Sequence, residues 1–130
     1  MTLAGLHPSL REYADYTLAI GRWYGLNPVV TSVLRTFGEQ AALRENYDAC
    51  TAQGLEGTSS SLRAGYSCRY PANRPGESAH NYGLAWDSQV PALDMDLWVK
   101  IRRGLGWHVP PADLIHAEYP DWQKYVVPPS

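Results

Sequence analysis

Long runs of one charge sign are absent from this 130-residue sequence, and its formal net charge at neutral pH is only -2. Proteins whose main partner is nucleic acid usually carry a basic patch or stripe, so this charge pattern excludes that class. The sequence also lacks an apolar stretch long enough to span a membrane, and its first residues lack the apolar core of a signal peptide. Internal repeats and a linker to a second module are missing too. We therefore expect a single domain over residues 1–130, with neither nucleic acid nor a membrane as partner.

Cysteine is scarce. The two cysteines, Cys50 and Cys68, lie on either side of a polar stretch rich in glycine and serine. They either close a disulfide across that stretch or stay as two free thiols in a reducing compartment. Cys68 has no second cysteine at the spacing of a metal site, and we assign neither residue a catalytic role.

The spacing of apolar residues predicts an α+β fold, in which a small antiparallel sheet is flanked by about three helices. Apolar residues recur at helical spacing over residues 8–24, which indicates a first helix. A short β-branched strand follows over residues 28–33. Thr36 and Glu39 have the spacing of a capping box, which predicts a second helix over about residues 36–46.

The second half of the chain begins with a long loop. Residues 51–77 are rich in glycine, serine and proline, and a loop of this length in a small domain usually serves binding or is mobile. Asp94 suits the cap of a third helix that includes Trp98. Residues 106–119 predict a hairpin or two short strands. We expect Trp98 and Trp107 in the core.

The stretch from Ser78 to Asp87 contains the first two candidate metal ligands. His80 and Asp87 lie seven residues apart, so they cannot share one face of a regular strand. A turn must come between them, and Gly83 suits it because glycine adopts positive φ without a steric penalty. We therefore expect His80 before the turn and Asp87 on the strand after it.

A second acid–histidine pair, Asp113 and His116, lies near the C-terminus. Two imidazoles and a carboxylate are the protein ligands of a catalytic zinc that keeps its fourth position for water. A further acid can then take the proton of that water. Two alternatives stay open at this stage: His108 as ligand in place of His116, and Glu118 as base in place of Asp113. Glu118 is a candidate because residues two apart share one face of a strand.

Five residues between Ser78 and Asp87 have a recognisable spacing: Ser78, His80, Gly83, Ala85 and Asp87. This pattern resembles the signature of the VanY-type zinc D-Ala-D-Ala carboxypeptidases and of their relatives, the phage L-alanyl-D-glutamate endopeptidases, which share a Hedgehog-like peptidase fold. Residues 6–11 and 30–43 resemble two other blocks of that family, in the same order. The resemblance covers most of the chain.

The resemblance implies one Zn²⁺ per chain, in a cleft, held by His80, Asp87 and His116. It implies Asp113 as the general base and Arg35 as the residue that binds the substrate or the developing oxyanion. It also implies substrate-binding positions, which are Ser32, Gln40 and Ser78.

Two departures from the family pattern bear on substrate preference more than on the metal. Val33 and Leu34 replace the usual Gly-Tyr pair before Arg35, and Ala117 stands where an aromatic residue usually follows the second histidine.

The function that the resemblance implies is hydrolysis of peptidoglycan stem peptides by a zinc metallopeptidase. Within that class we predict a monomeric L-alanyl-D-glutamate endopeptidase, like those of phage endolysins. The alternatives are a D-Ala-D-Ala carboxypeptidase and a catalytically silent zinc-containing module that binds cell wall or belongs to a phage structure. Without a signal peptide, such a protein would be made in the host cytoplasm and released to the cell wall, or carried by the virion.

Overall fold

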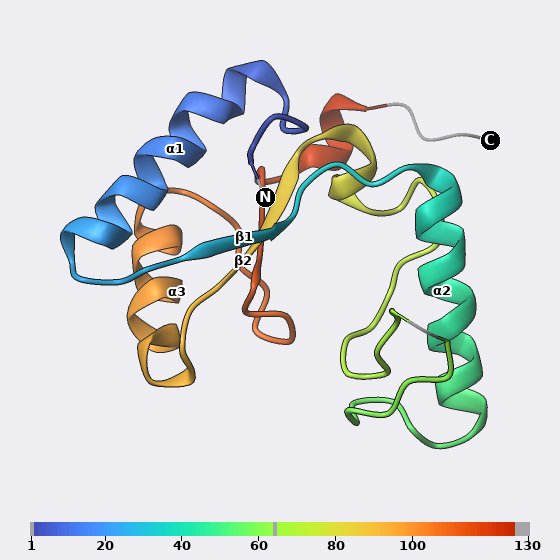
Figure 1. Cartoon of the computed structure of the whole chain (residues 1–130). Helices are drawn as coiled ribbons and strands as arrows, with labels where there is room; N and C mark the ends of the chain where they lie inside the picture. Colours follow the sequence, from blue (N-terminus) through green and yellow to red (C-terminus); the bar gives the residue numbers. More distant parts are fainter. Residues whose placement is uncertain (1, 64, 127–130) are drawn as a thin grey trace.

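The computed structural model describes residues 2–63 and 65–126. Within them, three α-helices surround a three-stranded antiparallel sheet (Figure 1), so the predicted α+β class is confirmed. The elements follow the order α1 (Pro8–Trp23), β1 (Val29–Ser32), α2 (Phe37–Ala52), β2 (Ala85–Gln89), α3 (Met95–Gly104) and β3 (His116–Glu118). No helix in the described part of the chain is both long and apolar enough to cross a membrane.

Helix α1 matches the prediction closely. Pro8 stands at its first turn, where the missing backbone N–H costs nothing, and the imidazole of His7 caps the turn by accepting a hydrogen bond from the backbone N–H of Ser9. The helix ends at Trp23, and Gly25 follows with a φ of 86°. This left-handed conformation is common just beyond a helix end.

Helix α2 begins at the predicted capping box but runs beyond its predicted end. The Thr36 hydroxyl accepts a hydrogen bond from the backbone of Glu39 at 3.0 Å, and the Glu39 carboxylate accepts one from the backbone of Thr36 at 3.1 Å. The helix continues to Ala52, whereas the sequence predicted an end near Asn46. Its additional turns contain Cys50, which forms a disulfide with Cys68. A tertiary contact therefore supports the part of the helix that local periodicity missed.

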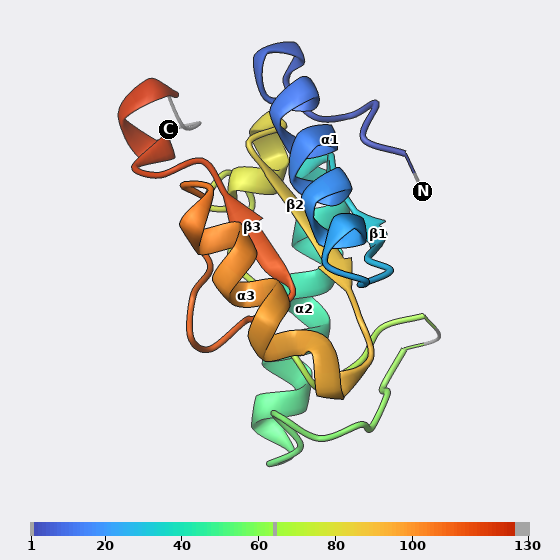
Figure 2. The same cartoon turned by 90° about the vertical axis from the view of Figure 1, so that its left-hand side faces the viewer.

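The sheet has β2 at its centre, paired with β1 on one side and β3 on the other. Helices α1 and α3 lie on one side of it and α2 lies on the other (Figures 1 and 2). Trp86 of β2 is fully buried and its ring lies edge-on to the rings of Trp98 and Trp107, at centroid distances of 6.3 and 5.5 Å. Both of those tryptophans are in the core, as predicted. Because side chains alternate along a strand, Asp87 points to the opposite face, toward α2.

Two predictions for the last third of the chain need correction. Asp94 occupies the cap position of α3, but its side chain makes no capping hydrogen bond, because a 3₁₀ turn over Ala92–Asp94 leads directly into the helix. Of the two expected strands over residues 106–119, only β3 is regular. His108 joins it through an isolated bridge to Glu118. The two prolines between them lack the N–H that a longer ladder needs.

Candidate metal centre

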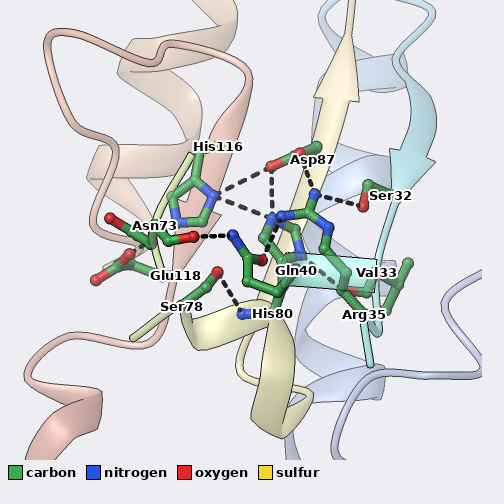
Figure 3. Close-up of polar contacts among 10 residues, drawn as sticks. All are labelled: Ser32, Val33, Arg35, Gln40, Asn73, Ser78, His80, Asp87, His116 and Glu118. Carbon is green, nitrogen blue, oxygen red and sulfur yellow. Dashed lines mark hydrogen bonds and ion pairs between the residues drawn. The ribbon is translucent and has the colours of Figure 1, made fainter. Parts of the chain in front are cut away.

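Three side chains predicted as metal ligands converge at one end of a cleft (Figure 3). His80 comes from a 3₁₀ turn over Ala79–Tyr82, Asp87 from β2, and His116 from the first position of β3. His80 Nε2 lies 3.0 Å from Asp87 Oδ1. His116 Nδ1 lies 3.1 Å from the same oxygen and 3.2 Å from His80 Nε2. Among the described residues, this trio is the group whose arrangement suits a metal ion.

Gly83 makes the turn between His80 and Asp87 possible. Its φ is 69°, and a Cβ at this position would lie 2.9 Å from the carbonyl oxygen of Gly5. Glycine is therefore required by both the backbone conformation and the close approach of another chain segment. The turn lets β2 start at Ala85, and the pairing of β2 with β3 then places Asp87 directly opposite His116.

In each imidazole, the nitrogen that points away from the cluster lies within hydrogen-bond distance of an acceptor. His80 Nδ1 lies 2.6 Å from the carbonyl oxygen of Val33, and His116 Nε2 lies 2.7 Å from Glu118 Oε1. When these nitrogens donate to their acceptors, His80 Nε2 and His116 Nδ1 each present a lone pair to the cluster. This support of ligating histidines through their other nitrogen is usual at metal sites.

The trio fits a zinc ion in geometry and in donor type. Bonds of about 2.0–2.1 Å in a tetrahedral arrangement place ligand atoms about 3.3 Å apart. The distances of 3.0 to 3.2 Å between the three donor atoms are close to this value. Three protein ligands leave one position for water, which is the arrangement of a catalytic rather than a structural zinc site.

Charge in the metal-free cluster is shared between Asp87 and His116. Burial raises the pKa of Asp87, but hydrogen bonds from His116 and His80 outweigh it and hold that pKa well below the usual range. Burial lowers the pKa of His116, but its bonds to Asp87 and Glu118 outweigh burial and raise it to about 9. His116 therefore carries a proton at neutral pH, and a metal ion must displace that proton.

We expect metal affinity to depend on pH for this reason. His116 is protonated below its pKa of about 9, so each metal ion that binds releases one proton there. The apparent affinity should then fall about tenfold per pH unit as the pH is lowered from about 8 to about 6. Titration with Zn²⁺ in buffers of different ionisation enthalpy would measure both the affinity and the number of protons released. An affinity that stays constant over this range would contradict the assignment of His116 Nδ1 as a ligand atom.

Asp113 and Glu118, the two candidates for the general base, differ in what they contact. Asp113 lines the same cleft, and its Oδ1 is buried without a hydrogen-bond partner among the described residues. Burial raises the pKa of Asp113, and the negative charge of Asp87 raises it further. Glu118 is already bonded to His116. Asp113 therefore presents a free carboxylate oxygen among the described residues of the cleft, whereas the Glu118 carboxylate is engaged with His116.

His108, the alternative ligand, lies outside the trio. Its side chain is exposed, and it contacts β3 through backbone hydrogen bonds with Glu118 at 3.0 Å in both directions. The second imidazole that reaches Asp87, beside that of His80, comes from His116.

Arg35 lies between β1 and α2 and points its guanidinium into the cleft. It donates hydrogen bonds to Gln40 Oε1 and to Ser32 Oγ, both at 3.1 Å, and its Nη2 lies 3.9 Å from Asp87 Oδ2. Burial lowers the pKa of Arg35, while the negative charge of Asp87 raises it. The predicted substrate-binding residues Ser32 and Gln40 thus contact this arginine. Ser78, the third of that group, lines the cleft and accepts a hydrogen bond from the backbone of His80 at 3.3 Å.

The loop that follows α2 contributes residues 65–67 and 70–73 to the lining of the cleft. It runs alongside α2 (Figures 1 and 2), and three side chains of α2 donate hydrogen bonds to its carbonyl oxygens. These are Gln40 to Asn73, Arg44 to Ala72 and Asn46 to Ser67, at 2.7, 3.1 and 3.4 Å. With the disulfide, they hold the wall of a cleft of about 380 Å³.

Comparisons with known proteins bear on the fold. No protein-family model matches the sequence, and no curated protein is significantly similar to it. Among solved structures, VanYB in complex with D-alanine-D-alanine is 19% identical, with a TM-score of 0.65 over 92% of this chain and 74% of that one. A vancomycin-resistance D,D-pentapeptidase VanY mutant in complex with Zn(II) is 19% identical, with a TM-score of 0.57 over 88% of this chain and 72% of that one. The LdcB LD-carboxypeptidase is 18% identical, with a TM-score of 0.60 over 89% of this chain and 66% of that one.

Proposed function

We propose that this chain, which has the VanY-type peptidase fold, is a zinc-dependent hydrolase of peptidoglycan stem peptides. The observation that carries the proposal is the His80–Asp87–His116 trio with the unpaired carboxylate of Asp113 in the same cleft. The bound Zn(II) and D-alanine-D-alanine named for the two VanY structures, and the peptidoglycan recognition named for LdcB, support the metal and the substrate class.

Each of the polar residues that line the cleft has a separate role in the proposed reaction. When bound, zinc lowers the pKa of a water ligand and polarises the scissile carbonyl. Asp113 accepts a proton from the attacking water, a role for which its raised pKa suits it, and then donates a proton to the leaving amine. Arg35 stabilises the negative charge that develops on the carbonyl oxygen, or binds a substrate carboxylate. Ser32 and Gln40 hold the guanidinium in the orientation that this needs.

Within this class we propose cleavage between L-Ala and D-Glu, as in phage endolysins. The second candidate is removal of a terminal D-Ala, which the D-alanine-D-alanine bound to VanYB favours. Either reaction takes place at the cell wall, which a phage endopeptidase would reach by release from the host cytoplasm or on the virion. The Cys50–Cys68 disulfide agrees with action outside a reducing compartment.

A digest of purified peptidoglycan tests the proposal. Zinc-loaded and chelator-treated protein are compared, and the released fragments are read by mass spectrometry. New termini between Ala and Glu that need the metal would establish the endopeptidase, and loss of a single terminal alanine would establish the carboxypeptidase. Bound zinc without any cleavage would instead indicate a binding or structural module.

Reduction of the Cys50–Cys68 disulfide should weaken substrate binding more than chemistry. The bridge joins two cysteines with a sequence separation of 18, and the loop between them contributes Gly65, Tyr66 and Ser67 to the cleft. Its removal should lower the free energy of unfolding by roughly 3 kcal/mol. We expect KM to rise severalfold, with kcat and zinc content nearly unchanged. The paired Cys50→Ala, Cys68→Ala variant, assayed beside the wild type with and without reductant, would measure this. A fall in kcat at constant KM would show that the wall positions catalytic groups rather than substrate.

A further inference from the structure

A buried arginine lies behind the turn that connects Asp113 to His116. Arg102, near the end of α3, has no solvent exposure. It makes no ion pair with any described residue, and its Nη1 has no hydrogen-bond partner among them. A buried cation without a carboxylate partner is costly unless other groups compensate for its lost hydration. Its contacts therefore call for a functional explanation.

Those contacts link α3 to the turn. Arg102 Nη2 donates a hydrogen bond to the carbonyl oxygen of Leu114 at 2.5 Å, and Nε donates one to the carbonyl oxygen of Trp98 at 3.3 Å. The guanidinium also lies over the Trp98 ring, 5.1 Å from its centroid. Arg102 is thus fixed by its own helix and extends one donor to the segment that carries the candidate base and a candidate ligand.

The turn itself has few other attachments. The backbone N–H of Asp113 donates to the carbonyl of Pro110 and that of His116 donates to the carbonyl of Asp113, both at 3.1 Å, but these bonds are internal to the segment. The carbonyl of Ile115 accepts from the backbone of Ser88 on β2 at 3.0 Å. The Leu114 side chain packs against the hydrophobic core, and among the described residues the hydrogen bond to its carbonyl oxygen comes from Arg102. Movement of this peptide group would displace Asp113 on one side and His116 on the other.

The Arg102 guanidinium stays charged although it is buried. Burial lowers the pKa of Arg102 to about 10, while the negative charges of Asp87 and Asp113 raise it. The guanidinium therefore stays charged at neutral pH, and the carboxylates of the cleft supply part of the compensation that a direct partner would give.

We propose that Arg102 is a positioning residue, which holds the Asp113–His116 turn through the Leu114 carbonyl and so sets the place of the base and of one metal ligand. This inference rests on the proposed metal centre. It predicts that the geometry and affinity of the metal site depend on a side chain that touches neither the metal nor the substrate.

Binding of Co²⁺, whose visible spectrum reports ligand geometry, tests the inference. Arg102→Met keeps the size of the side chain but removes the charge and the donors. We expect it to weaken Co²⁺ binding about 10–100-fold, the usual cost of losing an outer-shell contact, and to shift the spectrum. Arg102→Lys keeps the charge and one donor, and should fall between Arg102→Met and the wild type. The control is Arg103→Met, because Arg103 also holds a backbone carbonyl, that of Val109, at 2.7 Å but does not contact the turn.

The outcomes separate the inference from the proposed function. Wild-type protein that fails to bind Co²⁺ would overturn the metal centre itself. If the wild type binds and a folded Arg102→Met protein binds equally well with the same spectrum, Arg102 has a structural role only and the inference is wrong. Thermal melts identify the folded variants. Should Arg102→Met not fold, Arg102→Lys decides, and an affinity within about twofold of the wild type would overturn the inference.

Discussion

Replacement of Asp113 by asparagine should leave zinc bound and reduce hydrolysis of peptidoglycan stem peptides about 10²–10⁴-fold, the usual contribution of a general base. The metal should stay because the three candidate ligands, His80, Asp87 and His116, are unchanged. Activity should fall because the amide cannot accept the proton of the attacking water. Zinc content by mass spectrometry and the rate of fragment release, measured on the same preparation, would check both parts.

Glu118→Gln is the matched control, because it changes the other candidate base in the same way. The glutamine oxygen can still accept the hydrogen bond from His116 Nε2 that the structure shows at 2.7 Å. We therefore expect this variant to keep most of its activity, within about tenfold. If Asp113→Asn stays active while Glu118→Gln does not, Glu118 is the base and the assignment is reversed.

Replacement of His116 by alanine should remove the metal and with it the activity. The binding free energy of a four-ligand zinc site is about 10–16 kcal/mol. If the four ligands share it equally, each contributes about 2.5–4 kcal/mol, so the affinity for zinc should fall roughly 100–1000-fold. The loss should also leave Glu118 without its imidazole partner and Asp87 with only that of His80, which lowers stability. Competition with a chromophoric chelator would measure the affinity, and a thermal melt would show that the variant is folded.

His108→Ala serves as the comparison, since this exposed histidine lies outside the trio. It should bind zinc as the wild type does. A metal-loaded His116→Ala protein together with a metal-free His108→Ala protein would transfer the ligand role to His108.

Features that depend on near neighbours in the chain were predictable. The capping box of Thr36 and Glu39, the first turn at Pro8 and the left-handed Gly83 all follow from local hydrogen bonds and backbone sterics. Where a distant contact contributes, local signals failed. Helix α2 runs past Asn46 to Ala52 and includes Cys50, whose disulfide partner lies in the loop. The prediction for Asp94 failed for a local reason, because a 3₁₀ turn leads directly into α3.

The sequence by itself determined the α+β class, the place of the turn between His80 and Asp87, and the chemical types of the candidate ligands. These depend on residue identity and on spacings of a few residues. Only the tertiary structure decided which acid is free and which is engaged. Asp113 and Glu118 are equivalent as carboxylates, and the bond of Glu118 to His116 distinguishes them.

The closed disulfide and the contact of Arg102 with Leu114 were also decided by the tertiary structure. So was the register that sets His116 opposite Asp87, 29 residues away. Each of these joins segments that are distant in sequence. The packing of α2 and α3 on opposite sides of the sheet brings these segments together, and no local pattern records that packing.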